Sequence, residues 1–140
     1  MSDQTLQPLI EAAKRARLQS VAPFSKFLVG AAVRTENGKV YTGCNVESAS
    51  YGLTVCAERV AIWKALSEGE RQFTELAVVA DTDSLTPPCG TCRQIIWEFC
   101  KHARIVLANL HGKTEALSIV DLLPRAFDAR FLKEVTGQKS

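Results

Sequence analysis

The chain has 140 residues, of which 46% are hydrophobic and 23% charged, a balance typical of soluble globular proteins and unlike that of disordered or collagen-like chains. Its 17 basic and 15 acidic side chains give a net charge of +2, too small and too dispersed to indicate a nucleic acid or another polyanion as partner. This length predicts one domain with a core that is stable without disulfides.

The sequence also carries signals about its compartment. No apolar segment approaches the roughly 20 residues of a membrane-spanning helix, and Met1–Gln4 lacks the basic and apolar pattern of a secretory signal. We therefore expect a cytoplasmic protein without a membrane partner. Five cysteines are an odd number, and in a reducing compartment they favour metal binding or catalysis over a disulfide framework.

A helix and a hairpin are predicted first. Apolar residues recur at helical spacing from Leu6 onward, which predicts an amphipathic helix that ends near Ser20, and Pro23 prevents its continuation. Two strand-like segments, Phe27–Arg34 and Val40–Asn45, flank an Asn-Gly turn, which is the strongest short signal for a β-hairpin. We expect these two strands to pair antiparallel.

Helices and buried strands then alternate. A helix is predicted over Thr54–Glu68, and another begins near Cys89. Leu76–Ala80 and Arg104–Ala108 are continuously apolar, as expected of strands that are covered on both faces. A last short helix is predicted over Leu117–Leu123.

This order of elements predicts an α/β fold. We expect a three-layer α-β-α sandwich in which helices flank a mixed sheet of about five strands that begins with the hairpin. No repeat, linker or low-complexity segment divides the chain, so residues 1–140 are expected to form a single domain. The polar tail, Thr136–Ser140, is expected to fray.

Two short motifs place cysteines at the starts of the two central helices. Cys56-Ala57-Glu58 belongs to the first helix, and Pro88-Cys89-Gly90-Thr91-Cys92 opens the second after a Pro-rich loop. Cys89 and Cys92 can bind one ion from a single helical turn, and Cys56 arrives from another element as a third ligand. Soft thiolates favour zinc or an iron–sulfur cluster, and a set of three favours zinc with its fourth position open to water.

Charged neighbours suggest how such a centre works. Three thiolates on a dication leave a net negative charge, which weakens the effect of the ion on the acidity of its water. Arg59 is predicted to donate to a cysteine sulfur and offset that charge, whereas Arg93 has two alternatives, a local carboxylate or the thiolates. Glu58 is too near Cys56 to be an easy fourth ligand, so we assign it to proton transfer.

A closed structural zinc site is the main alternative for a Cys-x-x-Cys motif. It needs a fourth ligand, and Cys44, Cys100, His102 and His111 all lack a partner at ligand spacing. We expect these two cysteines to be small buried groups and the two histidines to lie near a helix end and a turn. Together the motifs match the zinc deaminase signature, with Cys in place of His in the first motif.

Four sequence blocks extend this match along the chain. They are Val29-Gly30-Ala31-Ala32, Gly43-Cys44-Asn45-Val46-Glu47-Ser48-Ala49-Ser50-Tyr51-Gly52, Cys56-Ala57-Glu58-Arg59 and Pro88-Cys89-Gly90-Thr91-Cys92-Arg93-Gln94. In this order, between Pro23 and Leu123, the sequence resembles the small, homotetrameric type of cytidine deaminase. The resemblance implies a cytidine-deaminase-like form of the predicted sandwich.

The resemblance also implies an activity. It is the zinc-dependent hydrolytic deamination of cytidine and deoxycytidine to uridine and deoxyuridine, with release of ammonia, in pyrimidine salvage. One zinc ion per subunit would be bound by Cys56, Cys89 and Cys92. Glu58 would move protons between the attacking water, N3 of the base and the leaving amine.

The same resemblance implies the substrate contacts. Asn45 and Glu47 would hold the ribose 3′-hydroxyl, the Ala57 backbone would help fix the base carbonyl, and Phe24 would pack near the pyrimidine. A carboxylate at the sugar would repel a phosphate, and no cluster of basic residues compensates for it. A nucleoside is therefore expected in preference to a nucleotide.

The C-terminal region implies an oligomer. Phe127 corresponds to a family aromatic that reaches into the site of a neighbouring subunit, which predicts a homotetramer with active sites at subunit interfaces. The family commonly continues with Gly-Pro, whereas this chain has Asp128 and Ala129. Val60 stands in place of a frequent Thr, and Trp97 in place of smaller residues. We expect these departures to change packing and to leave the chemistry intact.

Three other functions compete with this interpretation. Deamination of another cytosine compound, such as blasticidin S, shares the zinc motifs, but Phe24-Ser25 and Asn45-Val46-Glu47 favour cytidine. A polynucleotide deaminase would need a basic channel and exposed aromatic residues, and the basic residues here are scattered. A structural zinc or RNA-binding module would have a closed site and no need for Glu58.

Overall fold

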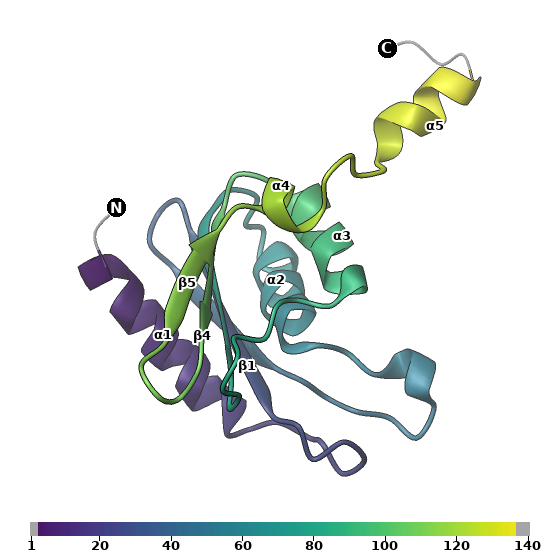
Figure 1. Ribbon diagram of the computed structural model, residues 1–140. Helices are drawn as coiled ribbons and strands as arrows, with labels where there is room; N and C mark the ends of the chain where they lie inside the picture. The colour runs from purple at the N-terminus through teal and green to yellow at the C-terminus, as the bar shows by residue number, and fades with distance from the viewer. Residues whose placement is uncertain (1–2, 137–140) are drawn as a thin grey trace.

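The computed structural model describes residues 3–136, so the predicted fraying of the tail falls on residues 137–140, outside the described part. Figure 1 shows the arrangement of its elements. They are α1 (Asp3–Arg17), β1 (Val29–Thr35), β2 (Val40–Cys44), the 3₁₀ helix η1 (Tyr51–Leu53), α2 (Ala57–Ser67), β3 (Phe73–Ala80), α3 (Gly90–Phe99), β4 (Arg104–Ala108), β5 (Thr114–Leu117), α4 (Ile119–Leu122) and α5 (Ala129–Thr136).

The strands form one mixed sheet in the order β2-β1-β3-β4-β5. β1 pairs antiparallel with both β2 and β3, β3 runs parallel to β4, and β5 returns antiparallel along β4. Helix α1 covers one face of the sheet, and α2 and α3 cover the other (Figure 1). The predicted three-layer sandwich and the initial hairpin are thus confirmed.

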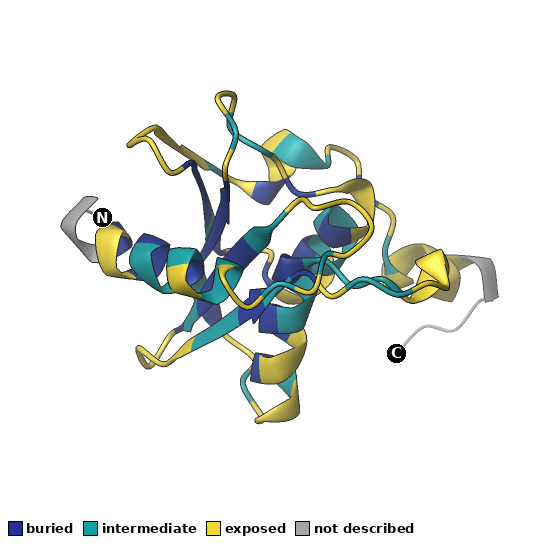
Figure 2. Cartoon of the chain, turned by 90° about the horizontal axis from the view of Figure 1, so that it is seen from below, coloured by how far each residue is buried: buried dark blue, intermediate teal, exposed yellow. Residues whose placement is uncertain are grey.

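The central strand β3 explains how the two layers of helices are held. Leu76 and Val78 pack in the core beneath α2 and α3, whereas Ala77 and Val79 pack against α1. Successive side chains of a strand point to opposite faces, so a continuously apolar strand serves both cores. The three inner strands, β1, β3 and β4, are accordingly mostly buried, whereas the edge strands β2 and β5 are not; buried residues are dark blue in Figure 2.

Both of the first two helices are shorter than predicted. α1 ends at Arg17 instead of near Ser20, because the three residues after it form a tighter turn of i→i−3 hydrogen bonds. α2 begins at Ala57 instead of Thr54, because Val55 is held extended by a bridge to the segment that follows β2. The first cysteine motif therefore lies at the helix start itself.

The C-terminal region differs more from the prediction. The predicted helix over Leu117–Leu123 is too long, because Leu117 closes strand β5, and α5 was not predicted. Asp128 caps α5: its Oδ1 accepts the Arg130 N–H at 3.0 Å, and its Oδ2 accepts the Trp97 indole N–H at 3.2 Å. Two positions that depart from the family pattern, Trp97 and Asp128, therefore contact each other.

Two glycines let the helices approach the hairpin. A Cβ at Gly30 would lie 2.0 Å from the Ala13 carbonyl oxygen of α1, and a Cβ at Gly43 would lie 2.4 Å from the Ala57 carbonyl oxygen of α2. Any side chain at either position would push the helix away, since real Cβ atoms do not come this close to backbone oxygens. The start of α2 is thus set directly against the sheet.

Candidate active site

The structure brings the three predicted ligand cysteines together. Cys56 and Cys89 are the capping residues immediately before α2 and α3, and Cys92 lies in the first turn of α3. Their sulfur atoms all lie within 4.8 Å of one another, with 3.6 Å between Sγ of Cys56 and Sγ of Cys89. Helices α2 and α3 pack on the same face of the sheet, and their N-terminal ends bring the three thiols into one cluster.

The chemistry of this cluster fits zinc. Thiol sulfur is the preferred donor for zinc, and three donors leave one position of a tetrahedron open. Within residues 3–136, no fourth His, Cys, Asp or Glu side chain joins the group, so Cys44, Cys100, His102 and His111 stand apart from it. The hydrogen bond with Cys92, helped by Arg59, lowers the pKa of Cys56 to about 5, which favours a ligating thiolate.

Arg59 lies where it can compensate thiolate charge. Its Nη2 is 3.6 Å from Sγ of Cys56 and 3.4 Å from the Thr54 carbonyl oxygen, and its guanidinium stacks 5.7 Å from the ring centre of Trp63. The buried Nε of Arg59 has no hydrogen-bond partner. A permanent cation is thus kept beside the first ligand by contacts on two sides.

Glu58 is a buried acid beside this cluster. Its side chain lies in the first turn of α2, and only 4% of the residue is exposed. Burial away from water, with a further contribution from the negative charge of Cys56, raises its pKa to about 7. A carboxyl group with a pKa near neutrality can both accept and donate a proton, which suits general acid–base chemistry.

A cavity of about 220 Å³ connects the cluster to the predicted sugar contacts. Its lining includes Cys56, Ala57, Glu58 and Cys89, together with Asn45 and Glu47. These residues come from the end of β2, the starts of two helices and the loops between them. Residues predicted separately from two motifs therefore share one cavity.

Two aromatic residues of the predicted site lie outside this cavity. Phe24 lines an adjoining hollow of about 370 Å³ that also contains Glu47, and its ring meets Tyr51 edge to face at 5.9 Å. Phe127 lies before α5, where it stacks on Phe131 at 5.9 Å. The structure therefore does not place either ring beside the cysteines within one chain, and their proposed contacts stay predictions.

The cavity has walls that the sequence did not assign. Phe27, Thr86 and Pro87 contribute to its lining, where the prediction had placed Phe24 and, from a neighbouring subunit, Phe127 as aromatic contacts. Thr86 and Pro87 could have been predicted from the Pro-rich loop to which they belong. This loop directly precedes the ligand residue Cys89, so its residues must lie near the site. Phe27 gave no such signal, since it resembles an ordinary strand residue.

Asn45 and Glu47 are held by backbone groups. Oδ1 of Asn45 accepts the Val29 N–H at 2.9 Å, and its Nδ2 donates to the Phe27 carbonyl oxygen at 2.8 Å. Oε1 of Glu47 accepts N–H groups from residues 24 and 25 at 3.0 Å each. The amide still has one N–H to donate, so an external hydroxyl can be bound without breaking these contacts.

Arg93 follows neither of its two predicted alternatives. Its Nε donates to the Pro88 carbonyl oxygen at 2.8 Å, and its Nη1 donates to the Leu122 carbonyl oxygen at 2.9 Å. The guanidinium therefore ties the loop before Cys89 to the end of α4. Its contacts are with backbone carbonyls, where a carboxylate or a thiolate had been expected.

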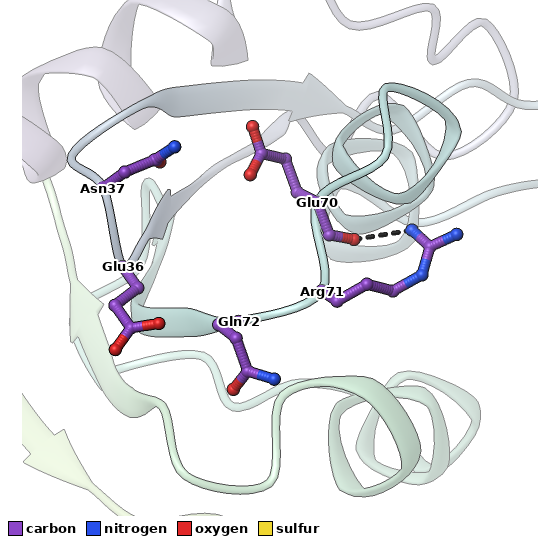
Figure 3. A pocket seen from close by; sticks show the side chains of 5 residues that line it. All are labelled: Glu36, Asn37, Glu70, Arg71 and Gln72. Atoms are coloured by element: carbon purple, nitrogen blue, oxygen red, sulfur yellow. Dashed lines mark hydrogen bonds between the residues drawn. The ribbon is translucent and has the colours of Figure 1, made fainter.

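Another hollow, of about 330 Å³, lies at the opposite end of β1 (Figure 3). Glu36, Asn37, Glu70, Arg71 and Gln72 line it, and Nη1 of Arg71 donates to the Glu70 carbonyl oxygen at 2.7 Å. Its side chains are those of an open polar surface between two turns. The chemistry of the molecule is therefore concentrated at the cysteine end.

Comparison with known proteins gives a consistent result. Residues 3–109 match the family described as the cytidine and deoxycytidylate deaminase zinc-binding region. A cytidine deaminase from Sporosarcina psychrophila is 47% identical over 95% of this chain and 98% of that protein. A blasticidin-S deaminase from Bacillus cereus is 31% identical over 89% of this chain and 92% of that protein.

Solved structures agree with the sequence relatives. The cytidine deaminase from Burkholderia pseudomallei superposes with a TM-score of 0.84 at 48% identity, covering 91% of this chain and 100% of that one. The enzyme of the same name from Mycobacterium tuberculosis gives a TM-score of 0.76 at 37% identity, covering 91% and 99%. The chain therefore belongs to the cytidine and deoxycytidylate deaminase family.

Proposed function

We propose that the chain catalyses the hydrolytic deamination of cytidine and deoxycytidine to uridine and deoxyuridine, with release of ammonia, in pyrimidine salvage. One observation carries the proposal: the cluster of three thiols borders, through Cys56 and Cys89, a cavity that is also lined by the buried acid Glu58 and by Asn45 and Glu47. Relatives named cytidine deaminases, matched over nearly their whole length, support the same substrate.

The chemistry is divided between an ion and an acid. Zinc held by Cys56, Cys89 and Cys92 would supply a Lewis acid that makes a water nucleophilic near neutral pH. Glu58 accepts a proton from the attacking water, protonates N3 of the base, and later delivers a proton to the leaving amine. Burial, which raises the pKa of Glu58, favours a carboxyl group that can hold a proton between these transfers.

The remaining residues orient the nucleoside. The Ala57 N–H lies at the first position of α2, where N–H groups have no hydrogen-bond partner within the helix. It can therefore donate a hydrogen bond to the base carbonyl. Asn45 and Glu47 form hydrogen bonds with the sugar hydroxyl, and Phe24 packs near the pyrimidine. Arg59 offsets thiolate charge beside Cys56.

We further propose that the active unit is a homotetramer in the cytoplasm, with each chain acting as one domain. Phe127 is 58% exposed at the start of α5, which projects from the body of the molecule (Figure 1), so its apolar surface is available to a neighbouring subunit. Of the helices within residues 3–136, none is long and apolar enough to cross a bilayer. The cysteines of the chain are free thiols, as a reducing compartment would keep them.

A direct assay tests the activity. Purified zinc-loaded protein should convert cytidine to uridine and ammonia, and Glu58→Gln should retain zinc while kcat falls by about 10²- to 10⁴-fold, since general acid–base groups contribute this much. Glu36→Gln is the matched control, because Glu36 is exposed beyond the far end of β1. It should retain full activity.

Other substrates complete the assay. Blasticidin S tests the function named for the Bacillus cereus relative, and a cytosine-containing oligonucleotide tests a polynucleotide deaminase. Turnover of either one in place of cytidine would replace the proposed substrate. A Glu58→Gln variant as active as the wild type would remove the proposed role of the acid. Zinc-loaded protein that turns over none of these substrates would favour a structural zinc module.

A further inference from the structure

The turn before β1 holds the carboxylate of Glu47 at three points. Oε1 of Glu47 accepts the N–H groups of Phe24 and Ser25, each at 3.0 Å. Oε2 of Glu47 accepts the hydroxyl of Ser25. An ionised carboxylate has about four lone-pair sites, so roughly one acceptor site is left for a ligand.

The turn is shaped to bind an anion. Its backbone is closed by the Lys26 N–H, which donates to the Ala22 carbonyl oxygen at 3.0 Å, and Lys26 adopts a left-handed conformation with φ of 61°. Consecutive N–H groups in such a turn converge on one point and form a concave anion site, often called a nest. Here the carboxylate of Glu47, from the segment after β2, occupies that site.

Ser25 links this site to the next backbone group. Its Oγ accepts the Phe27 N–H at 3.0 Å while its hydroxyl donates to Glu47. The two bonds form a chain in which the N–H polarises the hydroxyl and so strengthens its bond to the carboxylate. Phe27 itself lines the cavity with the cysteines, so the chain runs along the wall of the site.

We propose that Ser25 is a positioning residue for substrate: it fixes the rotation of the Glu47 carboxylate so that its remaining acceptor site meets the sugar hydroxyl. This inference rests on the proposed function. Glu47 lies on both the cysteine cavity and the adjoining hollow lined by Phe24, and only a carboxylate of fixed orientation directs its free lone pair at one of them. The same hydrogen bonds, with the charge of Lys26 nearby, lower the pKa of Glu47 and keep it an acceptor.

The kinetic test compares two substrates. Ser25→Ala should raise KM for cytidine by about ten- to a hundredfold, the usual effect of losing a hydrogen bond to a charged group, with little change in kcat. Ser25→Thr, which keeps a hydroxyl, should recover most of the loss. With 2′,3′-dideoxycytidine, which lacks the 3′-hydroxyl that would donate a hydrogen bond to Glu47, Ser25→Ala and the wild type should have the same KM.

Two controls separate positioning from general loosening. Ser48→Ala removes another loop serine whose Oγ accepts the N–H two residues on, as Ser25 does, but which has no bond to Glu47. Its KM should stay at the wild-type value. In a Glu47→Ala background, Ser25→Ala should add little, because the carboxylate that Ser25 would position is already absent.

A titration that needs no substrate completes the design. Carbon-detected NMR of the Glu47 carboxyl should give a higher pKa in Ser25→Ala than in the wild type and in Ser48→Ala. An unchanged pKa, or an equal rise in KM for cytidine and dideoxycytidine, would overturn the proposal. If the wild type leaves cytidine untouched while the pKa shift is found, the proposed function fails and the positioning of Glu47 stands.

Discussion

At the scale of residues, the site was predictable where chemistry depends on spacing. Cys89 and Cys92 lie three positions apart, and Glu58 follows Cys56 by two, so helical geometry alone indicates a metal site with an acid beside it. Phe27 escaped prediction because its place in the cavity depends on how the loop before β1 folds over the site. That fold follows from contacts with a distant segment, which no local pattern records.

The buried acid has a cost in stability that can be measured. In the zinc-free protein, the pKa of Glu58 rises from its usual 4.5 to about 7, so the folded state keeps a proton that the unfolded state has released. The group therefore destabilises the fold progressively as pH rises from about 4.5 to 7. Above that pH its full cost is on the order of 3 kcal/mol.

We therefore expect Glu58→Gln to be more stable than the wild type at pH 8 when both lack zinc, with a much smaller difference at pH 5. Urea unfolding of both proteins under reducing conditions, at equal chain concentration, measures this. A difference of the same size at both pH values would show that ionisation of Glu58 has no part in it. Any effect of Glu58 on stability would then have a cause other than the burial of its charge.

At the scale of elements, the sequence pattern predicts the hairpin, the two central helices and the two buried strands, but it does not predict β5 and α5. β5 has four residues, of which three are exposed, so no alternation of apolar and polar residues marks it as a strand. The start of α5 depends on Asp128, whose carboxylate binds Trp97 of α3. A contact of this range has no signature in the local sequence.

Arg93 illustrates how one helix supports the loop before it. Arg93→Ala removes two hydrogen bonds from a charged donor, so we expect a loss of about 2 kcal/mol in the free energy of unfolding. The loop that carries Cys89 should loosen with it, so zinc should pass faster to a chelator, which a chromogenic competitor can follow. Arg93→Lys should be intermediate, because an ammonium cannot span both carbonyls as a guanidinium does.

Arg71→Ala is the matched control for this variant. Arg71 also donates to two carbonyl oxygens, those of Leu66 at 2.9 Å and Glu70 at 2.7 Å, but it lies in the turn after α2, among the residues of the distant hollow. Its loss should leave the rate of zinc release unchanged. Equal zinc release from Arg93→Ala and the wild type would rule out a role of Arg93 at the ligand loop.

At the scale of the whole molecule, the single chain leaves large apolar side chains on its surface. Tyr51 is 76% exposed, Leu53 is 71% exposed and Phe127 is 58% exposed. Two of these lie in η1, close to the hollow beside Glu47, and the third lies two residues before α5. Surface of this kind around a site is typical of an interface, which supports assembly with other copies of the chain.

The proposed tetramer makes a prediction about mixed subunits. Sedimentation should give the mass of four chains, and both Glu58→Gln and Phe127→Ala should assemble yet show little activity. If each site combines Glu58 of one chain with Phe127 of another, coexpression of the two variants should restore part of the activity, because some interfaces then contain both intact residues. A fully active monomer, or no recovery in mixed tetramers, would contradict the shared site.

The contact of Gly43 with α2 determines where this protein can be redesigned. Because the sheet already meets the backbone of Ala57, no bulk can be added on that side without displacing Glu58. Another part of the cavity lining, Thr86 and Pro87, belongs to a loop without regular secondary structure. A variant intended for a bulkier pyrimidine should therefore be sought by changing that loop, where new shapes of the cavity need not disturb the acid.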